Sequence, residues 1–108
     1  EIDQHEAACV HFVLYKEDQA LATCRLLPLE ENTVKLQRMA VLKGSRGKEL
    51  GRALLEEVER FAHEQGITGI TLGAQSTAVP FYQSLGYTKH GEEFLDANIP
   101  HYKMDKQL

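Results

Sequence analysis

Residues 44–62 read GSRGKELGRALLEEVERFA, and this stretch decides which fold the chain can adopt. Its first part is rich in glycine and basic residues. From Leu50 to Ala62 the apolar residues recur at helical spacing, and Gly66 supplies a stop just beyond them. The stretch therefore predicts a basic, glycine-rich loop that leads into an amphipathic helix.

The segments before this loop carry the alternation of half-buried β-strands. Polar turns at 17–19 and 30–32 separate them, and Pro28 closes the second segment. Three strands joined by such short turns are typical of an antiparallel meander. The predicted strands are Val10–Lys16 (VHFVLYK), Ala20–Leu27 (ALATCRLL) and Val34–Leu42 (VKLQRMAVL).

The segment after the helix, Ile67–Leu72 (ITGITL), is short and β-branched, as buried strands are. A strand, a helix and another strand in this order predict a parallel β-α-β unit with a right-handed crossover. Ala78–Leu85 follows as a short helix with Pro80 in its first turn, where a missing N–H costs little.

The end of the chain predicts a final antiparallel pair, Tyr87–Phe94 and His101–Lys106, joined around residues 96–98. The expected fold class is therefore α/β, with one mixed sheet: an antiparallel meander, then the β-α-β unit, then the C-terminal antiparallel pair. Ligands in such sheets tend to bind where strand direction and crossover change, and the glycine-rich loop lies at that change.

Length and composition limit the number of domains and the class of protein. A chain of 108 residues suits a single domain, and 43% apolar with 26% charged residues is an ordinary globular balance. Neither a membrane-spanning run nor a signal peptide is recognisable, which predicts a cytoplasmic protein without a membrane partner. Cys9 and Cys24 lie in strand-like segments and are expected to be buried thiols. The histidines are scattered, so no metal site is expected.

Charge is distributed unevenly along the chain. The eighteen residues from Lys35 to Arg52 contain six basic residues and a single acid, Glu49. The isoelectric point is nevertheless about 5.7, whereas nucleic-acid-binding proteins usually carry a broad basic face. This pattern favours a small anionic ligand, and no nucleic-acid partner is expected.

The loop has the features that hold phosphate groups. First-turn N–H groups of a helix lack partners, glycines let a ligand approach the backbone, and basic side chains add charge. A Walker A loop is excluded because Glu49 follows Gly47-Lys48 where a hydroxyl is required, and no Rossmann GxGxxG occurs. An ordinary charged surface loop is the remaining alternative to an anion site.

The segment RMAVLKGSRGKELGRALLEEVE (residues 38–59) resembles the acetyl-CoA-binding segment of the GCN5-related N-acetyltransferase (GNAT) superfamily, whose signature is [Q/R]xxGx[G/A]. Arg46 fills its first position and Gly51 its last, while Glu49 stands where glycine is usual. AVPFYQSLGY (78–87) resembles the second motif, and GEEFLDANIPHYKM (91–104) is similar to a small bacterial branch that includes ElaA and YjcF. The resemblance implies one acetyltransferase domain over 1–108 that lacks the family's N-terminal strand and helices.

The resemblance implies roles for particular residues of the site. The backbone of Met39, Ala40 and Val41 would pair with the pantetheine arm of acetyl-CoA, the co-substrate. Tyr82 would protonate the departing thiolate as the catalytic acid, or would simply pack a short helix against the sheet. The residues expected around the pyrophosphate are Arg46, Gly47, Lys48, Glu49, Leu50, Gly51 and Arg52.

The implied reaction is direct attack of a primary amine, from a small molecule or a peptide, on the thioester in a ternary complex, in a monomer or homodimer. Neither cysteine lies near the motifs, which argues against an acyl-enzyme. A non-catalytic acyl-CoA-binding regulatory module is the alternative. The general base is left open among residues that would border the acceptor pocket: Asp3, His5, Glu92, Glu93, Asp96 and His101.

Overall fold

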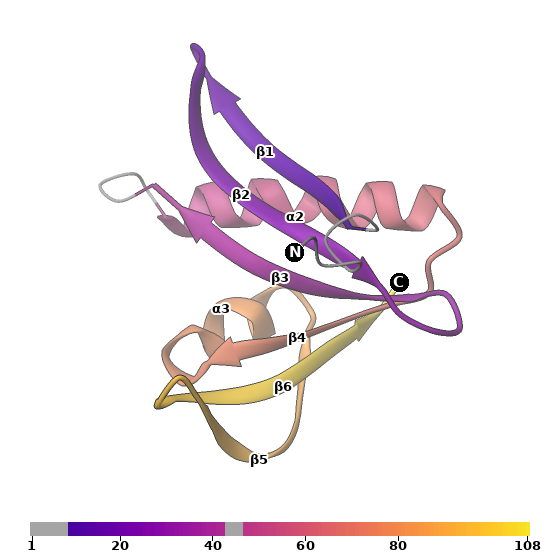
Figure 1. Ribbon diagram of the computed structural model, residues 1–108, viewed down its shortest axis with the longest axis vertical. Coiled ribbons are helices and arrows are strands. Elements are labelled where there is room, and N and C mark those ends of the chain that lie inside the picture. The colour runs from indigo at the N-terminus through magenta and orange to yellow at the C-terminus, as the bar shows by residue number, and fades with distance from the viewer. Residues whose placement is uncertain (1–8, 43–46) are drawn as a thin grey trace, which may run out of the picture.

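In the computed structural model, which describes residues 9–42 and 47–108, six strands form one mixed sheet in the order β1-β2-β3-β4-β6-β5 (Figure 1). The expected α/β architecture of meander, β-α-β unit and final antiparallel pair is confirmed. None of the described helices is long and apolar enough to cross a membrane. The elements are β1 Val10–Lys16, β2 Gln19–Pro28, β3 Thr33–Val41, α2 Gly47–Glu64, β4 Gly69–Gln75, the 3-10 turn Ser76–Ala78, α3 Val79–Ser84, β5 Thr88–Asp96 and β6 Ile99–Gln107.

Three tight turns of one kind connect the antiparallel strands. Each turn places two consecutive residues at positive φ: 17 and 18, 31 and 32, and 97 and 98. Positive φ at both central residues matches the right-handed twist of the flanking strands, and Asn and Asp tolerate it best among non-glycine residues. The polar turns expected from the sequence are thus the hairpin turns that fix the register of each strand pair.

Helix α2 ends in a hydrogen-bonded cap that changes where the next strand begins. Gly66 adopts φ +80°, its N–H bonds the carbonyl of His63 (3.1 Å), and the N–H of Ile67 bonds the carbonyl of Ala62 (2.9 Å). These two bonds form a Schellman motif. Ile67 therefore belongs to the helix cap, and β4 runs from Gly69 to Gln75, so the expected strand 67–72 was placed too early.

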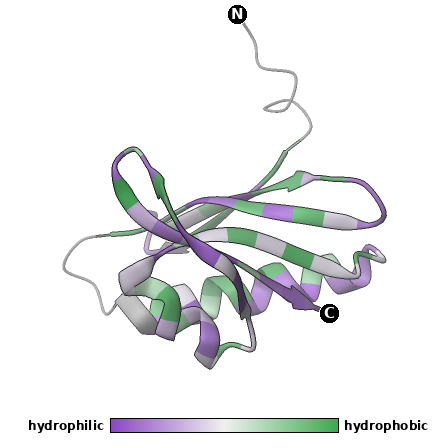
Figure 2. Ribbon diagram, turned by 90° about the horizontal axis from the view of Figure 1, so that it is seen from below, coloured by the Kyte–Doolittle hydropathy of each residue, from purple (hydrophilic) through white to green (hydrophobic). Residues whose placement is uncertain are grey.

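The core lies between α2 and the sheet. Leu55, Val58 and Ala62 of α2 are at most 1% exposed, and they face inward-pointing residues of the strands such as Leu26 and Met104. Figure 2 shows the alternation of apolar and polar residues along the strands that produces this one-sided core. The expectation that both cysteines are buried holds for Cys24, whereas Cys9 is half-buried.

The two central strands separate along their length. β3 and β4 pair in parallel only at residues 33–35 with 69–71, and beyond that they diverge (Figure 1). In β3 the register with β2 shifts opposite Cys24, and Arg38 adopts φ +56°, which marks a β-bulge. A bulge bends its strand, so this one accompanies the opening of the sheet.

Candidate functional site

A cleft of about 490 Å³ lies between the diverging strands. That volume lies within the range of small-molecule sites. One wall is residues 35–39 of β3 and the other is residues 72–75 of β4. Its remaining boundary is formed by Ala78, Tyr82, Phe94, Asp96 and His101, which come from the segments around α3 and from the C-terminal hairpin.

The N-terminus of α2 lies beside the tip of β3, the strand that forms one wall of this cleft. α2 begins within a few residues of the end of β3, and Figure 1 shows its first turn beside the tip of that strand. The N–H groups of a helix's first turn lack intrahelical partners, and the helix dipole adds partial positive charge there. An anionic group would therefore be stabilised at the start of α2.

The residues expected to hold a pyrophosphate are only partly described. Arg46 lies outside the described residues, as does the side chain of Lys48; of Gly47 only its place at the start of α2 is described. Because α2 begins at Gly47, the second half of the expected loop is helical, which corrects the loop boundary. The side chains of Glu49 and Arg52 are exposed, and that of Leu50 is half-buried.

Gly51 has a packing role that the sequence did not disclose. A Cβ at this position would lie 3.0 Å from Cζ of Phe81, closer than real Cβ contacts normally come. The absence of a side chain at Gly51 lets α2 pass close to α3. Because α3 also carries Tyr82, this contact helps to set where the tyrosine lies.

The three β3 residues expected to bind pantetheine lie where the strand has left β4. Ala40 pairs with Thr23 and Val41 with Ala22, so one edge of β3 is engaged by β2. The opposite edge faces the cleft because the pairing with β4 ends at residue 35. Of the three side chains, Met39 alone contributes to the wall of the cleft.

Tyr82 lies in the wall of the cleft on the side of the helices. Its side chain is 8% exposed, and its ring meets those of Phe81 and Tyr87 edge to face at 5.1 and 5.8 Å between centroids. Burial, with a smaller contribution from nearby Cys24, raises the pKa of Tyr82 above its ordinary value. The phenol is therefore protonated at neutral pH and can act as a proton donor.

A partly buried polar network holds α3 in place. Lys106 of β6 donates to Glu59 of α2 (2.8 Å) and to the carbonyl of Leu85 (2.7 Å), which follows α3. The hydroxyl of Tyr87 donates to the same carboxylate (2.8 Å). Burial, and then the adjacent Glu59 carboxylate, raise the pKa of Tyr87. The residues Glu59 and Lys106 thus join α2, β6 and the connection between α3 and β5, which restricts movement of the helix that bears Tyr82.

The candidate bases that the structure describes divide into two groups, inside and outside the cleft wall. Asp96 and His101 contribute to the cleft. Glu92 and Glu93 are exposed and lie outside its wall, and Glu93 accepts a hydrogen bond from Ser76 (3.0 Å). Asp3 and His5 fall outside the described residues.

His101 is held in a defined orientation. Its Nδ1 lies 2.7 Å from the carbonyl oxygen of Ile99. Its ring stacks on that of Phe94, with 5.8 Å between centroids and 28° between planes.

Residues in the wall that the sequence did not single out include Lys35, Gln37, Gly73, Gln75 and Phe94. Gly73 could have been recognised, because a glycine inside a strand often marks a close approach by another group. A Cβ there would lie 3.7 Å from Cζ of Phe94 and would point toward the cleft wall. The others carry no local signal, since they join the site only because the strands separate.

Comparison with known proteins identifies relatives of the whole chain. Residues 2–108 match the family model described as acetyltransferase (GNAT) domain. The uncharacterized N-acetyltransferase YjcF of Bacillus subtilis is 38% identical over 107 residues, which cover 98% of this chain and 76% of that protein.

Solved structures resemble the chain as well. Escherichia coli ElaA superposes with a TM-score of 0.83 at 26% identity, over 98% of this chain and 74% of that one. The PaiA N-acetyltransferase of Thermoplasma acidophilum, solved in complex with coenzyme A, superposes with a TM-score of 0.79 at 19% identity. That match covers 94% of this chain and 62% of the other, and it concerns the fold alone.

Proposed function

The chain belongs to the acetyltransferase (GNAT) domain family and is an acetyltransferase, and from this premise we propose that it transfers the acetyl group of acetyl-CoA to a primary amine by direct attack in a ternary complex. The observation that carries the proposal is the cleft between β3 and β4. Along one wall is the edge of β3 that no longer pairs with β4, the N-terminus of α2 lies beside the tip of that strand, and Tyr82 lies in the side of the cleft.

We place the coenzyme along β3, with its pyrophosphate at the start of α2. The PaiA structure contains coenzyme A, which supports this ligand for the shared fold. The pantetheine amides would pair with the backbone of residues 39–41, as an added strand pairs with a sheet edge. The backbone N–H groups of the first helical turn, with Arg46, Lys48 and Arg52, would hold the pyrophosphate.

The proposed reaction proceeds through a tetrahedral intermediate. The amine nitrogen forms a bond to the thioester carbon, and an N–H group of β3 stabilises the resulting oxyanion. The C–S bond then breaks, and Tyr82 gives its proton to the leaving sulfur. A phenol of ordinary pKa is a weaker acid than a thiol by roughly 2 kcal/mol. The raised pKa of Tyr82 enlarges this difference, so the proton transfer depends on close positioning of the phenol at the sulfur.

Direct attack is favoured because no suitable cysteine borders the cleft. Cys24 is 1% exposed in the core, and burial raises the pKa of its thiol to about 12, so it is not a thiolate at neutral pH. Cys9 precedes β1 and does not contribute to the cleft wall. An acyl-enzyme would need a nucleophile within reach of the thioester.

The proposal is tested by calorimetric titration of the purified protein with acetyl-CoA, followed by release of free thiol in the presence of a panel of primary amines. We expect micromolar binding, much weaker binding of S-acetylpantetheine, which lacks the pyrophosphate, and thiol release that depends on the amine. Binding without any amine-dependent release would identify a regulatory acyl-CoA-binding module instead. Absence of binding would refute the coenzyme site.

A matched pair of arginines in α2 locates the anion. Arg52→Ala should weaken acetyl-CoA binding about threefold to tenfold, because one charge near a phosphate contributes modestly at an exposed site. Arg60→Ala, two turns further along the same helix, should leave the affinity unchanged. Equal effects of both changes would mean that general charge, and no localised site, attracts the coenzyme.

A further inference from the structure

We propose that His101 is the general base that removes the proton from the attacking amine, an inference that rests on the proposed function. His101 contributes to the same cleft as Tyr82 and Met39. A reacting amine held in this cleft would therefore lie between a phenol that can donate a proton and an imidazole that can accept one.

The hydrogen bond of His101 selects its tautomer. A carbonyl oxygen can only accept, so the 2.7 Å contact with Ile99 requires the proton on Nδ1. In the neutral ring the lone pair is then on Nε2, the nitrogen that faces away from this bond. The carbonyl also keeps the ring in place when Nε2 gains a proton, because Nδ1 remains a donor in the imidazolium.

His101 and Tyr82 reach the cleft from opposite faces of the sheet. On β6, Met104 is buried in the core and Lys106 bonds Glu59 of α2, so the even-numbered residues face the helices. Side chains alternate along a strand, which places His101 on the open face. Tyr82 comes from α3, on the helix side.

This two-sided arrangement separates the two proton transfers. The thioester sulfur would lie on the helix side, next to Tyr82. The amine would enter from the open face, next to His101. Each reactant then meets the group that serves it, without the two groups exchanging a proton directly.

Asp96 is the competing candidate, because it also borders the cleft. It sits at the exposed end of β5, beside the turn, and no ring stacks against it in the described residues. An imidazole is a stronger base than a carboxylate near neutral pH, and His101 is fixed by both a hydrogen bond and the Phe94 ring. We assign Asp96 a different role: its carboxylate would attract a cationic amine to the open face of the sheet.

The proposed acetyl transfer involves two proton transfers, one at the amine and one at the sulfur. Nε2 of His101 takes a proton from the amine, whose nitrogen lone pair forms the bond to the carbonyl carbon. The C–S bond breaks, the electron pair goes to sulfur, and the sulfur takes the Tyr82 proton. The products are an amide and a free thiol; His101 then releases its extra proton to solvent, and Tyr82 takes one from solvent.

The test compares His101→Gln with His90→Gln, measured by thiol release with the best amine of the panel. His90 is the matched control: it is an exposed histidine on the neighbouring strand, paired with Asp105 (2.8 Å) outside the cleft. We expect kcat to fall about 100-fold or more for His101→Gln, with the acetyl-CoA Kd from calorimetry unchanged. His90→Gln should retain full turnover.

A second readout detects the missing base directly. Free imidazole added to His101→Ala should restore part of the lost turnover, which it would not do if the histidine only supported the fold. Undiminished kcat in His101→Gln, or a loss that Asp96→Asn reproduces and imidazole does not relieve, would overturn the assignment while leaving the acetyltransferase proposal intact. A wild-type protein that binds acetyl-CoA but acetylates no amine would overturn both.

Discussion

The pair of strands at the centre of the sheet has a closed region and an open region, and the two differ in what fills them. In the closed region, residues 33–35 and 69–71 pair, and the side chains of Val34 and Ile70 are at most 4% exposed. In the open region, residues 36–39 and 72–75 face the cleft. There the strands give up hydrogen bonds with each other, and a ligand backbone can supply them. Both regions contribute buried side chains to the core, since Leu36, Leu72 and Ala74 of the open region are also at most 4% exposed, whereas the cleft lies along the open region.

Among the substitutions proposed, Ile70→Ala should have the largest effect on the stability of the fold. Ile70 is 1% exposed in the closed region, and deletion of its buried carbons should lower the free energy of unfolding by about 3 kcal/mol. Gly73→Ala, in the open region, is the contrast: its Cβ has room beside Phe94, so stability should change little while the acceptor KM rises. Urea denaturation and thiol release measure the two quantities. A large loss of stability in Gly73→Ala would end the distinction between the regions.

Tyr82→Phe should lower turnover and leave stability nearly unchanged, which is the converse of the effect expected for Ile70→Ala. Loss of the hydroxyl removes the proposed acid, so kcat should fall roughly 100-fold, whereas acetyl-CoA affinity should stay within about twofold. The ring contacts with Phe81 and Tyr87 remain, so the unfolding transition should move little. Stopped-assay thiol release and calorimetry provide the measurements. Unaltered kcat would assign Tyr82 to packing alone and leave the open region without an acid.

Gly51→Ala probes the contact that couples α2 to α3. Overpacking against Phe81 costs about 1–3 kcal/mol, and the higher helix propensity of alanine returns about 1 kcal/mol, so a net loss near 1 kcal/mol is expected. Phe81→Leu in the same chain should remove the penalty, which a double-mutant cycle in urea would show. Net stabilisation by the single change would mean that the Phe81 ring moves aside freely.

The order of the elements follows from local sequence, whereas the site does not. Alternation in Val10–Lys16 and the polar turns predict the meander because each signal acts over a few residues. The strand after the helix was misplaced because Ile67, apolar and β-branched, reads as strand although its N–H closes the helix cap. Propensity cannot anticipate a cap that depends on Gly66 adopting positive φ.

The cleft arises from tertiary structure. Motif resemblance selected Tyr82 and Met39, and both contribute to its walls. The sequence could not choose among the four C-terminal candidate bases, because the choice depends on which residues of the hairpin pass beside the open region. The register of His101 with Gln75 and Phe94 decides it, and register between distant strands is not encoded in any short window.

The core behind the cleft should respond to alkaline pH. Burial raises the pKa of the Cys24 thiol to about 12, well above that of an unfolded cysteine, so the folded state holds its proton more tightly. The resulting stabilisation is complete below about pH 8.5 and is lost as the pH rises toward 12. Unfolding free energy at pH 10 should be about 2 kcal/mol lower than at pH 7.5. Cys24→Ala should be less stable at pH 7.5 but should lose less between the two pH values; equal pH slopes would contradict this.

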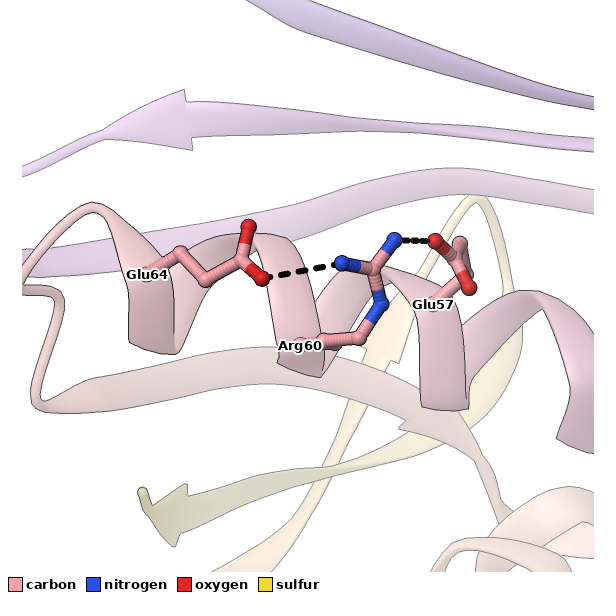
Figure 3. A network of polar contacts seen from close by, with 3 residues as sticks. All are labelled: Glu57, Arg60 and Glu64. Carbon is pink, nitrogen blue, oxygen red and sulfur yellow. Dashed lines mark hydrogen bonds and ion pairs between the residues drawn. The ribbon is translucent and has the colours of Figure 1, made fainter.

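The smallest effect is expected on the outer surface of α2, away from both regions. Arg60 pairs with Glu57 and with Glu64 (2.9 Å), three and four residues away along the helix (Figure 3). All three side chains are more than half exposed, and such pairs contribute about 0.3–0.5 kcal/mol each in water and less at high salt. Arg60→Ala should therefore lower the unfolding free energy by about 0.5 kcal/mol in low salt and by less in 0.5 M salt, without changing turnover. A loss above about 2 kcal/mol, or one that is insensitive to salt, would show that this exposed surface is coupled to the core.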